Sequence, residues 1–172
     1  MKPANRMAFG VVVLLALGLA SRLAVAETKL TDFNGTWQGS GTDRSTPLEA
    51  TQQTTCRATI NADVVRMAAH IVCNGAAGLT KVIQLNITLA GDAFSGTLVQ
   101  KATTSGSRSS ETDLSGSVSG HKTDKTAKFT VSFPGLTPSV AVVLTLNAPT
   151  SFSMQATTLG GQLMNVNFKK SS

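Results

Sequence analysis

The sequence has few of the residues on which many protein functions depend. Among its 172 residues there is no Tyr, one Trp, two Cys and two His. The shortage of Tyr and Trp argues against a transmembrane barrel, whose two interfaces carry girdles of these residues. The shortage of His and Cys leaves little material for a metal site. Charged residues make up only 14% of the chain, which argues against a disordered tail or a coiled coil.

Candidate catalytic groups are equally scarce. His70 lies on the more polar face of its segment, His121 lies in a predicted turn, and no G-x-S-x-G nucleophile elbow is present. The acids lie mostly at predicted turns, among them Asp43, Asp63 and Asp92, where Asp is favoured for backbone reasons. We therefore expect a protein that is not an enzyme and that holds no cofactor or metal.

Residues 1–26 have the three parts of a secretory signal peptide. Lys2 and Arg6 precede an apolar run over 9–20, and Ala24-Val25-Ala26 matches an A-x-A cleavage site. The run is shorter than the roughly 20 residues that span a membrane. We expect a periplasmic or secreted protein with no stable membrane insertion after cleavage; an uncleaved anchor helix is the alternative.

The remaining chain, residues 27–172, is long enough for one domain with a buried core. Three of the 15 basic residues lie in the signal segment and all nine acids follow it, so this part carries a net charge of +3. The basic residues are scattered and not interleaved with aromatics, as a nucleic-acid surface would require. We expect no nucleic-acid partner, and we expect a monomer.

Most segments of residues 27–172 alternate apolar and polar side chains with period two, which is the pattern of half-buried strands. About ten short alternating segments follow one another with turn signals between them, and no segment has helical periodicity. They lie at about 33–41, 48–60, 64–73, 81–89, 93–101, 114–118, 127–133, 140–146, 152–156 and 164–168. We predict an all-β fold, an antiparallel up-and-down meander of about 8–10 strands closed into a lipocalin-like or avidin-like barrel.

Cys56 and Cys73 share the apolar faces of two consecutive predicted strands. Both thiols should therefore point inward from neighbouring strands. An exported protein reaches an oxidising compartment, so the pair is predicted to form a disulfide. A redox or metal pair is the alternative, but there is no C-x-x-C spacing to support it.

The most specific motif is Phe33-Asn-Gly-Thr-Trp37. A Gly two residues before a Trp on the first strand resembles the opening of lipocalin-like and avidin-like barrels. The resemblance implies that Phe33, Gly35 and Trp37 form a core plug at one end of the barrel. The wider pattern, with Cys56-Arg57 and Val72-Cys73, is similar to small exported bacterial β-proteins without an assigned activity. Avidin's biotin site has no counterpart here, because its several Trp side chains are missing.

A second resemblance is to secreted bacterial metalloprotease inhibitors built on an avidin-like barrel. They also combine a Gly-x-Trp first strand with one early disulfide. In that family the free N-terminal segment enters the protease cleft. The matching segment here is 27–32, whose charged sequence ETKLTD differs from the small, uncharged start of those inhibitors.

Two functions follow as hypotheses. The first is a non-catalytic binding module for a small apolar ligand in the barrel interior; the second is a protein-interaction barrel such as an inhibitor or envelope-stress factor. A barrel filled by its own side chains would bind nothing inside. The most apolar faces lie on one strand and on a neighbouring one, and none of their residues is charged. The candidate ligand-lining residues are therefore Ile83, Leu85, Leu89, Phe129, Val131 and Phe133.

The signal segment yields the first testable prediction. Cleavage after Ala26 follows from the A-x-A site and the short apolar run. N-terminal sequencing of the exported protein should therefore begin at Glu27. A mature protein that retains Met1 would contradict this prediction.

Overall fold

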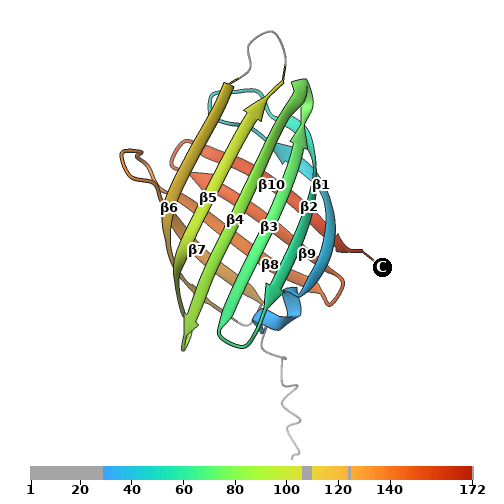
Figure 1. Cartoon of the computed structure of the whole chain (residues 1–172), viewed down its shortest axis with the longest axis vertical. Coiled ribbons are helices and arrows are strands. Elements are labelled where there is room, and N and C mark those ends of the chain that lie inside the picture. The colour runs from blue at the N-terminus through green and yellow to red at the C-terminus, as the bar shows by residue number, and fades with distance from the viewer. Residues whose placement is uncertain (1–28, 106–109, 124, 172) are drawn as a thin grey trace, which may run out of the picture.

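The computed structural model describes residues 29–105, 110–123 and 125–171, so the predicted signal segment lies outside the described residues. It contains ten strands, two short 3-10 helices and connecting turns (Figure 1). The elements are η1 (Leu30–Phe33), β1 (Gly35–Asp43), β2 (Gln52–Ala62), β3 (Arg66–Gly75), η2 (Ala76–Gly78), β4 (Leu79–Ala90), β5 (Ala93–Thr104), β6 (Ser110–Lys122), β7 (Thr126–Ser132), β8 (Val140–Ala148), β9 (Ser151–Thr158) and β10 (Gly161–Lys170).

Every strand pairs with its sequence neighbour, and β1 also pairs with β10, so the meander closes into a barrel. All pairings are antiparallel, as β1 with β10 illustrates through the register Gly39 to Phe168. Closure pairs the two strands that would otherwise expose an edge. The predicted all-β meander and its closure are therefore confirmed, with ten strands.

The period-two pattern separates the inside from the outside of the barrel. On β2 the side chains of Thr54, Cys56, Ala58 and Ile60 are buried, and the residues between them are exposed. Leu48, which was predicted to begin this strand, is 98% exposed and lies in the β1–β2 connection. Leu48 is apolar but has no strand partner in the β1–β2 pairing, which begins at Gln52, so it does not extend the strand.

Phe33 also departs from the prediction. It is the last residue of η1, whereas the sequence places it at the start of the first strand. The main-chain N–H of Asp32 donates to the Lys29 carbonyl (3.0 Å) and closes the helical turn. The chain then enters β1 through Gly35, whose φ of +129° is a conformation that L side chains rarely adopt. Gly35 thus turns Phe33 under the end of the barrel.

Four aromatic rings close the η1 end of the barrel, and we call them the aromatic floor: Phe33, Trp37, Phe152 and Phe168. The Phe152 ring is central. It stacks on Phe168 at 4.6 Å and meets Trp37 (4.9 Å) and Phe33 (5.6 Å) edge to face. All four side chains are at most 1% exposed. Edge-to-face and stacked pairs of this kind add to the free energy of area burial.

Trp37 anchors the floor to the backbone as well. Its indole N–H donates to the Phe33 carbonyl at 2.8 Å, so this buried polar group has a partner. The Lys170 ammonium lies 5.2 Å from the ring centroid, within the range of a cation–π contact. The Gly-x-Trp motif therefore positions one ring that η1, β9 and β10 all contact.

The predicted disulfide between Cys56 and Cys73 is confirmed. The two residues lie directly opposite each other on β2 and β3, and both are buried inside the barrel. The bond closes a loop with a sequence separation of 17 residues. It joins strands that the β2–β3 turn already places side by side.

Removing the disulfide should destabilise the protein without changing its fold. The Cys56→Ala/Cys73→Ala variant should lose about 3 kcal/mol of unfolding free energy, the chain-entropy value for a loop of this size. Denaturant unfolding of oxidised wild type and variant measures the difference. Equal stability, or two titratable thiols in the unreduced unfolded wild type, would contradict the assignment.

Emptying the aromatic floor should cost more. Trp37→Ala should lose about 3–5 kcal/mol, the range for large core truncations. Trp37→Phe is the matched control: it keeps a ring but leaves the Phe33 carbonyl without its donor, so about 1–3 kcal/mol should be lost. Denaturant unfolding followed by circular dichroism compares the three proteins.

Because Trp37 is the sole Trp, its fluorescence reports on this site alone. The native wild type should emit at short wavelength and shift to the red on unfolding. Red-shifted emission from the folded protein would contradict burial of the ring.

Candidate ligand cavity

A cavity of about 230 Å³ occupies the barrel interior above the aromatic floor. Its wall is mainly aliphatic and aromatic and comes from all ten strands and from the connections after β1 and β7. The apolar lining residues are Ile60, Met67, Ala69, Ile71, Ile83, Leu85, Leu98, Leu114, Phe129, Val131, Phe133, Leu136, Pro138, Val140, Val142, Leu144, Phe152, Met154, Ala156, Leu163 and Met164. The interior is thus hollow at this level and closed below by Phe152.

Of the six residues proposed from the sequence, the structure brings five to the cavity wall: Ile83, Leu85, Phe129, Val131 and Phe133. The strands that carry them are not neighbours, because β5 and β6 lie between β4 and β7. The β4 residues and the β7-side residues therefore line the same cavity from strands that are not paired with each other.

Leu89 does not line the cavity. It has the inward phase of β4 but lies one residue before the end of that strand, opposite Phe94 of β5. This is the end of the barrel that the aromatic floor occupies. Phase alone places a side chain inside the barrel, whereas the level along the strand decides whether it reaches the cavity.

The cavity opens at the end of the barrel opposite the floor. Ser45 and Pro138 line it and are exposed, and Leu136 lines it with 50% exposure. Leu48 and Leu159 lie in connections at this same end and are 98% and 93% exposed. We call this end the mouth. Apolar side chains therefore continue from the cavity wall to the surface.

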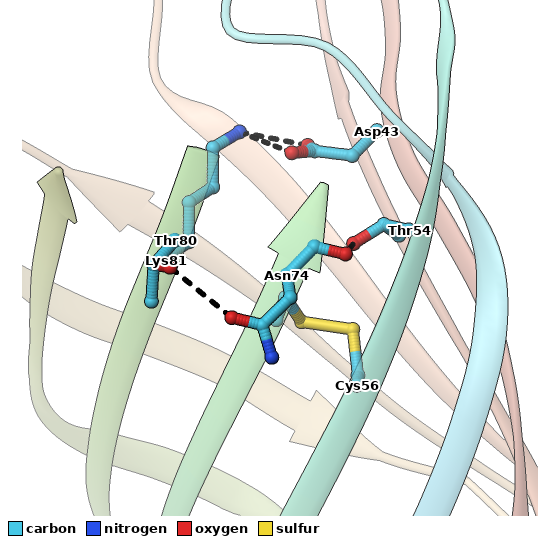
Figure 2. Close-up of a disulfide and its surroundings, with 7 residues drawn as sticks. Asp43, Thr54, Cys56, Asn74, Thr80 and Lys81 are labelled. Carbon is cyan, nitrogen blue, oxygen red and sulfur yellow. Dashed lines mark hydrogen bonds and ion pairs between the residues drawn. A yellow bond between two sulfur atoms is a disulfide. The ribbon is translucent and has the colours of Figure 1, made fainter. Parts of the chain in front are cut away.

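A buried ion pair lies in the cavity wall at the mouth. The Lys81 ammonium of β4 is 2.7 Å from both carboxylate oxygens of Asp43, the last residue of β1. Figure 2 shows the two side chains pointing toward one another across the barrel interior. Their side chains are only 7% and 2% exposed, and both line the cavity. The pair spans β2 and β3, which separate its two strands.

This ion pair corrects two expectations from the sequence. The sequence predicts an interior lined by uncharged residues and places Asp43 at a turn. A signal for both charges is nevertheless present in the sequence. Lys81 has the same phase as Ile83 and Leu85, and Asp43 has the same phase as Trp37. A charge at an inward position of a strand indicates a buried partner.

The neighbouring residues at the mouth ends of β1 to β4 include small and neutral ones. Thr54 is the inward residue of β2 at this level, and its hydroxyl donates to the Asn74 carbonyl at 3.1 Å (Figure 2). The Thr80 hydroxyl donates to the Asn74 side-chain oxygen, also at 3.1 Å. Gly41 of β1 precedes Asp43 on the same face, and a Cβ there would lie 2.0 Å from the Asn165 carbonyl oxygen. Close approach of β10 therefore requires glycine at this position.

Arg44 adds a second cation to the mouth. Its guanidinium donates through Nε to the Gln162 carbonyl and through Nη1 to the Pro47 carbonyl, the latter at 2.8 Å. Both acceptors are neutral. Among the described residues, no carboxylate lies within ion-pair distance of Arg44. Arg44 therefore makes no direct ion pair there, and the Glu49 carboxylate of the same connection accepts from the Ser45 main-chain N–H at 3.2 Å.

Other candidate chemistry lies outside the cavity. His70 and His121 are exposed on the outer surface. The described residues contain no group of three His, Cys, Asp or Glu side chains placed to hold a metal ion. Every helix in the described part of the chain is too short or too polar to cross a membrane.

Comparisons with known proteins give little beyond this geometry. No protein-family model matches the chain, and no curated protein matches it. Among solved structures, a redesigned β-barrel matches with 19% sequence identity and a TM-score of 0.39, over 86% of this chain and 100% of its own.

Proposed function

We propose that this protein is a non-catalytic binding module that holds a small apolar molecule in its barrel. The observation that carries the proposal is the cavity of about 230 Å³, which is lined mainly by apolar side chains and opens at one end. Apolar pockets with a few placed polar groups are the usual form of small-molecule sites. Apolar ligand surface buried there contributes favourably in proportion to its area.

The volume limits the ligand to a small molecule. A dry apolar cavity of about 150 Å³ holds benzene, so the present volume suits a ligand of about nine heavy atoms. A molecule of this size can fill the space between the aromatic floor and the mouth. Larger ligands would have to project through the mouth, past Leu136 and Pro138.

We also propose that the protein acts in the periplasm or outside the cell. The signal-like segment and the disulfide support this, because disulfides form and persist in oxidising compartments. The disulfide alone is compatible with export and does not establish it.

The second candidate, an inhibitor-like interaction barrel, has less support from the structure. That mode of action needs a free N-terminal segment. Here Leu30 and Phe33 are 3% and 1% exposed and pack into the end of the barrel. The exposed Leu48 and Leu159 are the features that favour an interaction surface.

A neutral apolar probe tests the binding proposal directly. We expect 1-octanol, which is of about the limiting size, to bind wild type one-to-one and saturably in calorimetry. Ala69 lines the cavity and Ala68 is exposed on the same strand. Ala69→Phe should fill part of the cavity and weaken binding about tenfold or more, since filling removes the ligand's space. Ala68→Phe, the matched control, should bind as wild type does.

Both variants must retain native circular dichroism and Trp37 fluorescence for the comparison to hold. Absence of saturable octanol binding to wild type, or undiminished binding by a folded Ala69→Phe variant, would contradict the proposal. Native mass spectrometry of protein purified from its own host should in addition detect a retained small molecule.

A further inference from the structure

The two ends of the cavity differ in chemistry. The floor end is formed by Phe152 and aliphatic side chains, whereas Asp43, Arg44, Ser45, Lys81 and Gln100 all line the cavity on the mouth side. Asp43 ends β1 there, and Lys81 is the third residue of β4 from the same end. A purely apolar ligand would leave these polar groups facing apolar atoms. A ligand with one polar head and one apolar tail matches both ends.

The charges at the mouth favour one sign of head group. Lys81 and Asp43 neutralise each other, whereas within the described part of the chain Arg44 donates to two carbonyl oxygens and forms no ion pair. The cavity wall therefore carries two cations and one anion. Burying an ionised ligand without an opposite charge nearby has a large desolvation cost. Because the charges that line this cavity are positive in sum, they favour a negatively charged head group.

Lys81 also retains hydrogen-bonding capacity. An ammonium has three donors, and the Lys81 ammonium contacts the two carboxylate oxygens of Asp43. A third N–H remains for a ligand oxygen. Charge-assisted bonds of this kind are shorter and stronger than bonds between neutral groups.

Stability does not by itself explain why this chain buries an ion pair. Desolvating two charges offsets most of their attraction, and well-packed apolar residues of similar volume are often at least as stabilising. The pair lies in the wall of a cavity. In that position a charged pair can distinguish ligands by the polarity and charge of their head groups, which an apolar wall would not do.

We propose that the ligand is an amphiphile with a single carboxylate, of about the size of octanoate. The carboxylate accepts a hydrogen bond from Lys81 at the mouth, and Arg44 adds a second positive charge to the cavity wall there. The alkyl chain extends toward Phe152 and the aromatic floor. This inference rests on the proposed binding function and specifies the ligand class of the same cavity.

Three probes with the same chain and different head groups test it: octanoate, 1-octanol and octylammonium, each titrated calorimetrically into wild type at neutral pH. Octanoate should bind about tenfold or more tighter than octanol, because a charge-assisted hydrogen bond replaces a neutral one. Octylammonium should bind more weakly than octanol. These comparisons need no variant and so do not depend on whether a variant folds.

The variant Asp43→Asn/Lys81→Met assigns the preference to the buried pair. It removes one charge of each sign and leaves the net charge unchanged. The ratio of its octanoate affinity to its octanol affinity should be about tenfold lower than in wild type, because the charge-assisted hydrogen bond from Lys81 is lost. The matched control is Lys101→Met/Asp113→Asn. It removes an ion pair of 2.9 Å whose side chains are 51% and 53% exposed, and it should keep the wild-type preference.

The outcomes separate this inference from the proposed function. If wild type binds octanol but shows no preference for octanoate, only the carboxylate inference is overturned. The same holds if octylammonium binds tightest, or if folded Asp43→Asn/Lys81→Met keeps the preference. If octanol does not bind wild type, the proposed function itself fails.

Discussion

Closure of β1 onto β10 is the constraint on which the rest of the structure depends. It fixes the barrel at ten strands, and the interior of a barrel widens with strand number; about eight strands enclose a space that side chains just fill. Large rings are therefore needed to close a wider interior. Phe152, Trp37 and Phe168 provide them at one end. Above them the wall is mainly apolar and includes small residues such as Ala69, and a cavity remains.

Much of the fold could be predicted from the sequence because it depends on local alternation. Period two identified the strand segments, and the shared phase of Cys56 and Cys73 predicted a bond that the register places directly across two strands. Phe33 could not be placed in the same way. Its phase matches that of Trp37, but Gly35 turns the chain between them, and η1 follows from that turn and from packing against the barrel end.

The cavity and its charges were harder to predict because they depend on relations between distant strands. Strand number and stagger determine the interior width, and neither is encoded in a local pattern. Asp43 and Lys81 belong to strands separated by two others, so nothing in their sequence spacing pairs them. Their inward phase was nevertheless visible. A charged residue at an otherwise apolar, inward-facing strand position therefore predicts a buried charge with an oppositely charged partner.

The cavity is also costly to the fold. An interior that its own side chains leave unfilled lacks the packing contacts that a filled core would have. The disulfide stabilises by constraining the unfolded chain and fills none of this space. Larger side chains at Ala69 or Ala156, which both line the cavity, would occupy it. A ligand in the cavity would restore the lost contacts and, by binding only the folded state, would add to its stability. The proposed ligand binding would account both for a hollow interior and for the small residues that keep it hollow.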